Sequence, residues 1–166
     1  QDAGAFGGEM RNVVISCEHL DLATGEQGVF EGDELDFAYR HSVYSAGGYV
    51  VTALNLRLEK GDKQEIKAKM DELMARRKDK QPLEYPSAGS VFKRPVGYFA
   101  GGLIEQCGLK GASEGGAQVS PKHAGFIVNT AGATCEDVLR LIERIQRTVK
   151  EETGVTLECE VRKTGE

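Results

Sequence analysis

Apolar and polar residues alternate along much of the first sixty residues, which is the pattern of strands with one buried face. Residues 12–22 (NVVISCEHLDL) and 49–58 (YVVTALNLRL) predict strands, and residues 23–26 (ATGE) predict a turn. Residues 35–40 (LDFAYR) also alternate and predict a short strand or an extended segment. The first part of the chain is therefore expected to be rich in β-structure.

A helical period replaces this alternation after residue 60. Residues 61–80 predict a surface helix whose apolar positions recur every three or four residues, at Ile66, Met70, Leu73 and Met74. The helix ends in the basic run 76–78, which suits the negative end of the helix dipole. A phosphate site is the alternative interpretation of this run.

Three weaker signals follow in the middle of the chain. Residues 81–90 hold two prolines and no period, so they predict a loop or an extended segment. Residues 99–107 place Ala100, Leu103, Ile104 and Cys107 on one face of a helix. Residues 126–129 (FIVN) predict a short buried strand.

The clearest helix begins at Thr134, with Asp137 at the capping-box position, and ends at Gly154. Its apolar stripe comprises Val138, Leu141, Ile142, Ile145 and Val149. Residues 155–162 (VTLECEVR) alternate and predict a final strand. Strands followed by helices and further strands indicate the α+β fold class.

Composition narrows the possible functions. The chain has 166 residues, a formal charge of −5, 40% hydrophobic and 28% charged residues, which is typical of a globular domain. The acidic balance argues against nucleic-acid and membrane partners, and no apolar run is long enough to cross a bilayer. The four cysteines form no CxxC pair, so no metal site is expected, and reduced thiols indicate a cytoplasmic protein.

The glycine-rich stretch 4–9 (GAFGGE) is a candidate cofactor loop, because glycine lets backbone amides approach a ligand closely. Its spacing matches neither the dinucleotide fingerprint nor the phosphate-binding P-loop. The stretch is therefore a weak signal when taken alone.

Three side chains could carry chemistry, and each has an ordinary alternative. Ser90 lies in a Gly-Ser-Val-Phe sequence without the hydrolase GxSxG motif, and a turn serine bonded to its own backbone is the alternative. Arg40 could hold a carboxylate or a phosphate, or form a surface ion pair. Glu160 shares a face with Glu158 and Arg162, which is either a buried pair or a solvated face.

Taken together, the blocks of sequence resemble one enzyme family. They are AGAFGGEM, FAYRHS, PSAGSVFKRP, FAGGLIEQCGLKG, GGAQVSPKHAGFIVN, GAT with its helix, and LECEVR. In this order they closely resemble UDP-N-acetylenolpyruvoylglucosamine reductases, the flavoenzymes that complete UDP-N-acetylmuramate in bacterial peptidoglycan synthesis. The direct passage from residue 58 to the helix at 61 resembles the class that lacks a substrate-capping insertion.

The resemblance implies FAD as cofactor, NADPH as hydride donor and UDP-N-acetylglucosamine enolpyruvate as substrate. It implies that Ser90 delivers a proton to the substrate carbon beside the carboxylate, and that Arg40 and Glu160 stabilise the enol-like intermediate. The cofactor-binding residues expected from it are Gly4, Gly8, Glu9 and Arg40. The residues expected to bind the UDP-sugar are Tyr39, Arg94, Gln118, Lys122 and His123, with Arg77 and Lys78 as further candidates.

The resemblance also implies a domain plan. Residues 1–60 would be the C-terminal portion of a FAD-binding domain, and residues 61–166 a complete substrate-binding domain. The family has an upstream half of the FAD-binding domain, so residues 1–166 alone are expected to be inactive. The family pattern also has Asn before the glycine-rich block, where this chain has Gln1-Asp2 before Ala3. The chain is expected to be a monomer, and a non-catalytic UDP-sugar-binding module is the competing hypothesis.

Overall fold

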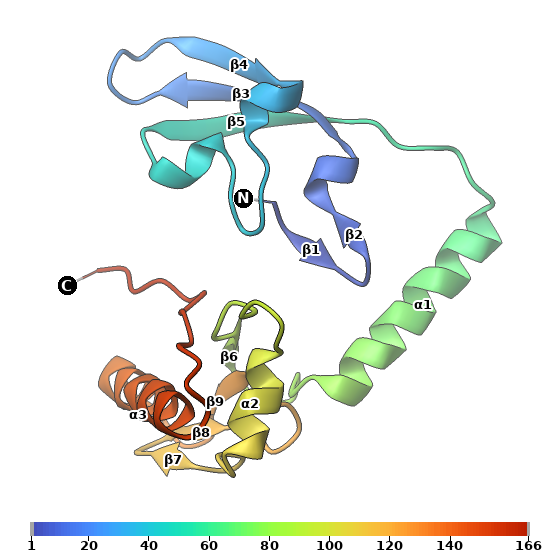
Figure 1. Ribbon diagram of the computed structural model, residues 1–166. Coiled ribbons are helices and arrows are strands. Elements are labelled where there is room, and N and C mark those ends of the chain that lie inside the picture. The colour runs from blue at the N-terminus through green and yellow to red at the C-terminus, as the bar shows by residue number, and fades with distance from the viewer. Residues whose placement is uncertain (1, 166) are drawn as a thin grey trace. The chain divides into compact units, whose positions relative to one another are not determined.

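The computed structural model describes residues 2–165 and divides the chain into two compact units, between Leu73 and Met74 (Figure 1). Both units contain antiparallel sheets, and three α-helices accompany them in the described residues. The predicted α+β class is confirmed. In the described part of the chain, no helix is both long and apolar enough to cross a membrane.

The first unit is built on a three-stranded antiparallel sheet with β3 in the middle (Figure 1). Its strands are β3 (Val14–Asp21), β4 (Gln27–Glu31) and β5 (Tyr49–Leu56). A small hairpin precedes the sheet, formed by β1 (Gly4–Ala5) and β2 (Gly8–Glu9). Short 3-10 helices complete the unit, at Met10–Asn12, Gly32–Leu35 and Val43–Ala46.

Aromatic rings pack around His19 at the centre of this sheet. The His19 ring is buried, stacks on Phe30 at 4.3 Å between centroids, and meets Tyr44 and Tyr49 edge-on. Gly28 lies opposite His19 in the register, and a Cβ there would come within 2.6 Å of His19 Nε2. Glycine at position 28 therefore leaves the space that the ring fills.

The second unit contains a four-stranded antiparallel sheet in the order β6-β9-β8-β7. Its strands are β6 (Ser87–Ser90), β7 (Ser113–Glu114), β8 (Ala117–Val119) and β9 (Phe126–Asn129). Two helices accompany them, α2 (Ala100–Gln106) and α3 (Cys135–Thr153), while α1 (Lys63–Lys80) runs through the boundary between the units.

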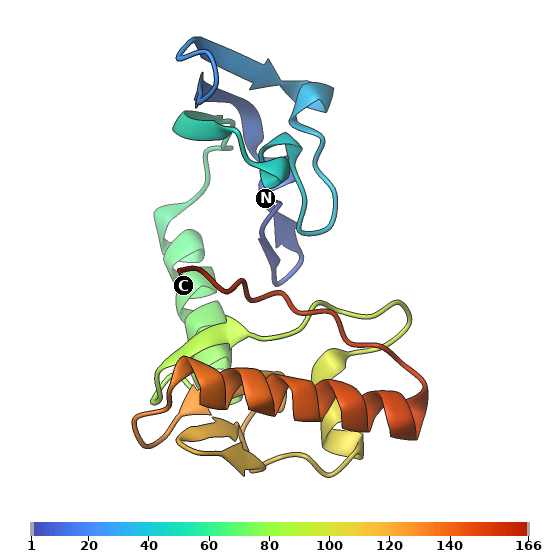
Figure 2. The same ribbon diagram turned by 90° about the vertical axis from the view of Figure 1, so that its left-hand side faces the viewer.

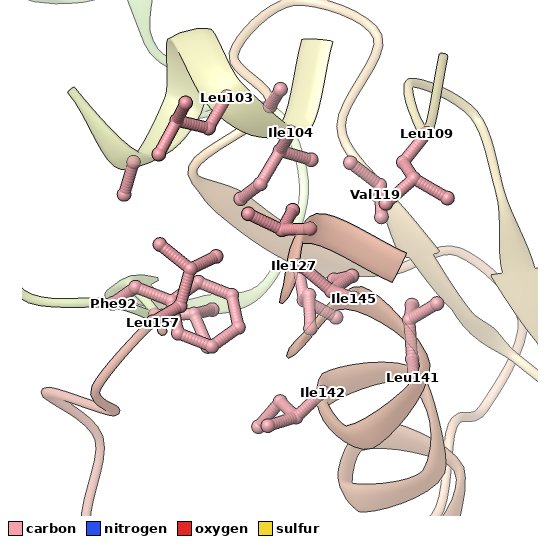
Figure 3. Close-up of a cluster of buried hydrophobic side chains, with 14 of the residues drawn as sticks. Phe92, Leu103, Ile104, Leu109, Val119, Ile127, Leu141, Ile142, Ile145 and Leu157 are labelled. Carbon is pink, nitrogen blue, oxygen red and sulfur yellow. The ribbon is translucent and has the colours of Figure 1, made fainter. Parts of the chain in front are cut away.

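One apolar core holds this unit together (Figure 3). Leu103 and Ile104 of α2 lie across from the α3 side chains, with Ile127 of β9 close to Ile145. Burial of such side chains contributes about 1.5–3 kcal/mol each before entropy is counted. The apolar stripes predicted for α2 and α3 are the ones that supply this core.

Local signals place the ends of α3 correctly. Thr134 Oγ1 accepts the Asp137 amide at 3.1 Å, and the Asp137 carboxylate accepts the Thr134 amide at 2.9 Å. Gly154 ends the helix in the left-handed conformation at φ 74°. The predicted capping box and C-cap are both confirmed.

Several predicted elements need correction. Residues 35–40 form no strand, because Asp36 and Arg40 take positive φ angles and only isolated bridges remain at Ala38 and Tyr39. Residues 81–90 include strand β6. Residues 155–162 keep the inward–outward alternation but form only one bridge, between Cys159 and Phe92. The predicted surface helix is confirmed as α1, with no buried residue among its described side chains, and it begins at Lys63 instead of residue 61.

Candidate active site

Ser90 is the last residue of β6 and pairs with Phe126 of β9. Gly89 before it has φ 85°, which an L side chain rarely adopts, so the glycine sets the turn of the backbone. The Ser90 side chain is exposed, and its hydroxyl donates a long hydrogen bond of 3.4 Å to the Phe92 carbonyl. The backbone contact expected of a turn serine is present, but it leaves the hydroxyl accessible.

Backbone hydrogen bonds bring Glu160 next to the Ser90 segment. The segment after α3 turns back and runs beside the residues that follow β6 (Figure 2). The Glu160 amide donates to the Val91 carbonyl at 2.8 Å, and the Lys93 amide donates to the Glu158 carbonyl at 2.8 Å. The half-buried Glu160 therefore lies on the segment bonded to the residue after Ser90.

The side chains around Glu160 separate into two faces, as the sequence indicates. Leu157 is buried, and Cys159 and Val161 pack against the core. Glu158 and Arg162 are exposed, and Glu158 forms an ion pair with Lys93. Of the three polar residues on this face, Glu160 is the one that is partly buried, which makes it the best candidate for chemistry.

Arg40 lies in the first unit, at a tight turn. The His41 amide donates to the Ala38 carbonyl at 2.9 Å, and Arg40 inside this turn has φ 54°. Its guanidinium carbon lies 4.9 Å from the centroid of the half-exposed Tyr39 ring, a cation–π contact. The turn holds the two side chains beside each other.

A buried carboxylate fixes this turn to the N-terminal segment, and sequence reasoning missed it. The Asp2 amide donates to the His41 carbonyl at 3.0 Å, while the Asp2 carboxylate accepts the Arg11 amide at 3.0 Å. Burial raises the pKa of Asp2, but the hydrogen bonds and the charge of Arg11 together lower it by more, so the net shift of the pKa is downward. Gln1 precedes Asp2 at the point where this chain departs from the family pattern, and it lies outside the described residues.

The glycine-rich hairpin fits the role of a cofactor loop in part. Phe6 and Gly7 both have positive φ, at 53° and 85°, so the tip is a tight turn. A Cβ at Gly4 would lie 3.1 Å from Glu9 Cγ, whereas a Cβ at Gly7 would meet no described atom within 4 Å. The open space beside Gly7 lets a ligand approach the backbone. Gly8 makes only an ordinary contact, so close packing does not require glycine there.

The expected UDP-sugar residues all lie in the second unit except Tyr39. Arg94 places its guanidinium carbon 4.0 Å from the centroid of Phe99, which is exposed. Gln118 Nε2 donates to the Gly111 carbonyl at 3.3 Å. Lys122 Nζ donates to the Lys78 carbonyl near the end of α1 at 2.7 Å, so it already serves a structural contact.

His123 sits in the turn between β8 and β9 with its ring half-buried. Its Nδ1 accepts the Gly125 amide at 3.1 Å, and its ring meets Phe126 edge-on at 4.9 Å. Burial is the largest cause that lowers the pKa of His123. The ring is therefore held neutral, with Nδ1 as acceptor and the proton on Nε2.

Comparison with known proteins decides the family. The sequence model described as "UDP-N-acetylenolpyruvoylglucosamine reductase, C-terminal domain" matches residues 81–164, which include Ser90, Glu160 and the second sheet. The chain belongs to the UDP-N-acetylenolpyruvoylglucosamine reductase family. The resemblance stated from the sequence blocks is confirmed.

Members of this family are similar along nearly the whole chain. The reductases of Caldanaerobacter subterraneus subsp. tengcongensis and Agathobacter rectalis are each 53% identical over 99% of this chain. The crystal structure of the reductase from Thermus caldophilus is 38% identical and covers 97% of this chain with a TM-score of 0.81. The chain spans about half the length of these relatives, 54%, 52% and 56% respectively.

Proposed function

We propose that this chain is the part of a reductase of peptidoglycan synthesis that acts on UDP-N-acetylglucosamine enolpyruvate, with FAD as cofactor and NADPH as hydride donor. The observation that supports the proposal best is the pairing of the Ser90 and Glu160 segments through the 2.8 Å bond from the Glu160 amide to the Val91 carbonyl. This pairing lies in the region that matches the C-terminal domain of the reductase family. The reaction is assigned to the cytoplasm, where thiols stay reduced.

Ser90 acts in this proposal as the proton donor. Reduction of the enolpyruvyl double bond adds a hydride to one carbon, and the neighbouring carbon beside the carboxylate then takes a proton. A hydroxyl is a weak acid, so it serves only when it is positioned at a strongly basic carbon. The exposed hydroxyl, on a backbone held by Gly89 and the pairing with strand β9, supports this role.

Arg40 and Glu160 stabilise the enol-like intermediate in this proposal, and Arg40 holds the charge that develops at the substrate carboxylate. A guanidinium binds a carboxylate through two parallel hydrogen bonds and holds the negative charge of an enolate-like state. The positive φ of Arg40 fixes the direction in which its backbone presents the side chain. Glu160 supports the protonation step from the segment beside Ser90.

The cofactor is assigned to the first unit. FAD, when bound, supplies the redox chemistry by passing the hydride of NADPH to the substrate. The open backbone at the β1–β2 turn supports its binding there, with Gly4, Gly8, Glu9 and Arg40 as the residues proposed to hold it. Gly4 and Glu9 form one pair of the hairpin, so a contact to either depends on the same local geometry.

The UDP-sugar is assigned to polar side chains of the second unit and to Tyr39. Arg94, Gln118 and Lys122 are the proposed residues, and Arg77 and Lys78 are further candidates. Addition of UDP-N-acetylglucosamine to isotope-labelled residues 1–166 is expected to shift the NMR signals of Arg94 and Gln118. Unchanged signals at both residues would contradict their assignment to the nucleotide-sugar.

Turnover tests the proposal as a whole. The purified full-length protein is expected to oxidise NADPH continuously, beyond the single reduction of its flavin, only when UDP-N-acetylglucosamine enolpyruvate is present, and to give a product heavier by two hydrogen atoms. A non-catalytic binding module would bind the UDP-sugar without oxidising NADPH. Absence of substrate-dependent oxidation in a preparation that binds both flavin and UDP-sugar would contradict the proposal.

A further inference from the structure

We propose that His123 is a positioning residue for Ser90. The His123 ring holds the backbone of Gly125 through Nδ1 and makes no contact with the UDP-sugar. This inference rests on the proposed function, because it gives Ser90 a task that depends on exact placement. The family resemblance led to the expectation that His123 contacts the ligand, and the hydrogen bonds below favour a role inside the fold instead.

The His123 turn is fixed by its own hydrogen bonds. The His123 amide donates to the buried Ser120 Oγ at 3.2 Å, and the Phe126 amide donates to the His123 carbonyl at 3.0 Å. Inside this turn, His123 Nδ1 accepts the Gly125 amide at 3.1 Å. The histidine therefore supplies the partner that the buried Gly125 amide needs.

Two glycines leave space for the imidazole ring. A Cβ at Gly125 would lie 3.1 Å from His123 Cε1, and a Cβ at Gly101 of α2 would lie 3.3 Å from the same atom. Both distances are closer than ordinary van der Waals contact. The ring is thus packed against α2 and the turn, and it has little freedom to move toward a ligand.

Backbone contacts connect Gly125 to the Ser90 segment. The Gly125 carbonyl accepts the amide of Val91, the residue after Ser90, at 2.9 Å. The Cβ position of Gly125 lies 3.7 Å from Ser90 Oγ, so the glycine forms part of the surface beside the hydroxyl. One peptide segment therefore joins the histidine acceptor to the backbone that carries the proton donor.

The protonation state of the ring agrees with this role. A nitrogen that accepts a hydrogen bond from an amide carries no proton, so the neutral ring keeps its proton on Nε2. Burial is the largest influence and lowers the pKa of His123; a hydrogen bond to its own backbone raises the pKa by less, followed by Lys110, which lowers it, and Glu105, which raises it. A protonated ring would lose the acceptor on which Gly125 depends.

Two substitutions distinguish the role of His123 Nδ1 from that of Nε2. In His123→Asn the amide oxygen stands close to the position of Nδ1 and can accept the Gly125 amide, whereas in His123→Gln the polar atoms reach the position of Nε2. Both variants lose the ring and its contact with Phe126, so they are matched controls for packing.

In the full-length protein, His123→Asn is expected to keep the rate of flavin reoxidation by the enolpyruvyl substrate near that of the unaltered enzyme. His123→Gln is expected to slow this step by about 10²-fold, the effect of a small misplacement of a reacting group, with an unchanged KM for substrate. Flavin reduction by NADPH should stay normal in both. Hydrogen exchange of the Gly125 amide should become faster in the Gln variant alone.

Equal slowing in both variants would overturn the proposal, because only ring packing would then matter. A raised KM in His123→Asn together with a normal His123→Gln would also overturn it and favour a ligand contact through Nε2. Should the Gln variant fail to fold, the Asn variant still decides, since loss of its reoxidation rate contradicts the proposal. Failure of the proposed function differs from all of these, because the unaltered enzyme would then show no substrate-dependent oxidation.

Discussion

At the scale of single residues, the Asp137 carboxylate shows how local hydrogen bonds set a charge. The amide and the hydroxyl of Thr134, followed by Arg140, lower the pKa of Asp137 to about 2. The residue lies at the first turn of α3, where the helix dipole also favours a negative charge. The ionised carboxylate is therefore part of what holds the start of this helix.

The lowered pKa of Asp137 predicts the acid limb of the stability curve, which is the fall in the free energy of unfolding as the pH is lowered. A carboxyl whose pKa is lower in the folded state stabilises the fold above its unfolded value of 3.8, and this stabilisation is lost as the pH falls through about 2. Asp137→Asn should lower the free energy of unfolding above pH 4 (about the unfolded pKa) and flatten its fall below that pH. Urea unfolding across this pH range measures both effects.

Glu143→Gln is the matched control for Asp137→Asn. Glu143 lies on the exposed side of the same helix, so this change should leave the acid limb as it is in the unaltered protein. An acid limb in Asp137→Asn that is as steep as in the control would show that the capping hydrogen bonds do not set it.

Local sequence identifies residues such as Asp137, but it does not identify contacts made across the fold. Thr134 and Asp137 are three positions apart, so the capping box can be read directly from the chain. The contact from His123 to Ser90 passes through Gly125 and β9, which are distant from Ser90 in sequence. The roles of Ser90, Arg40 and Glu160 came from the family resemblance, since spacing alone left each one with an ordinary alternative.

At the scale of elements, the turn between β7 and β8 is packed against the start of α3. A Cβ at Gly116 would lie 2.6 Å from the Ala133 nitrogen and 2.8 Å from the Ala131 oxygen. Both are backbone atoms, which cannot move aside as a flexible side chain can. The close approach of the turn to the loop that leads into α3 therefore depends on glycine at this position.

Two glycine-to-alanine changes test this packing. Gly116→Ala should destabilise the protein by about 1–3 kcal/mol, as overpacking of a tight site does. Gly102→Ala, inside α2, meets only an ordinary 3.8 Å contact with Phe99 Cβ, and should stabilise by up to about 1 kcal/mol through helix propensity. Thermal unfolding measures both, and a Gly116→Ala protein as stable as Gly102→Ala would refute the close approach.

The accuracy of element prediction follows from how local each signal is. Helix α3 has a cap at each end and a full apolar stripe, so its bounds were predicted well. Strands β4, β7 and β8 were missed because they are only two to five residues long, too short for a clear alternation, and their pairing is what makes them strands. Residues 155–162 were wrongly predicted as a strand because they bury alternate side chains while pairing mainly through isolated bonds to residues 91–93.

At the scale of the whole molecule, the first unit leaves many large apolar side chains exposed. Val29, Val50, Leu54 and Leu56 of the three-stranded sheet are each 46–50% exposed. The relatives are about twice as long as this chain, so each has further residues outside the part that matches. The family resemblance implies that those residues include part of the flavin site.

Residues 1–166 alone are accordingly expected to bind flavin weakly and to oxidise no NADPH. The physical reason is that the proposed flavin contacts in this chain are few, with the open backbone at the β1–β2 turn as the main one. Absorbance at about 450 nm, the flavin band, after purification measures bound cofactor. A near-stoichiometric flavin content would contradict this expectation.

The central claim is that Ser90 donates the proton to the reduced substrate, and stopped-flow spectroscopy of full-length Ser90→Ala tests it most directly. The change removes only a hydroxyl, so NADPH should still reduce the flavin at a near-normal rate. Reoxidation by the enolpyruvyl substrate should slow by about 10²–10⁴-fold, the usual contribution of a positioned general acid. Glu160→Gln should give the same split, whereas Arg40→Ala should also weaken substrate binding. Equal slowing of both half-reactions in Ser90→Ala would contradict the claim and leave Ser90 as a structural turn residue.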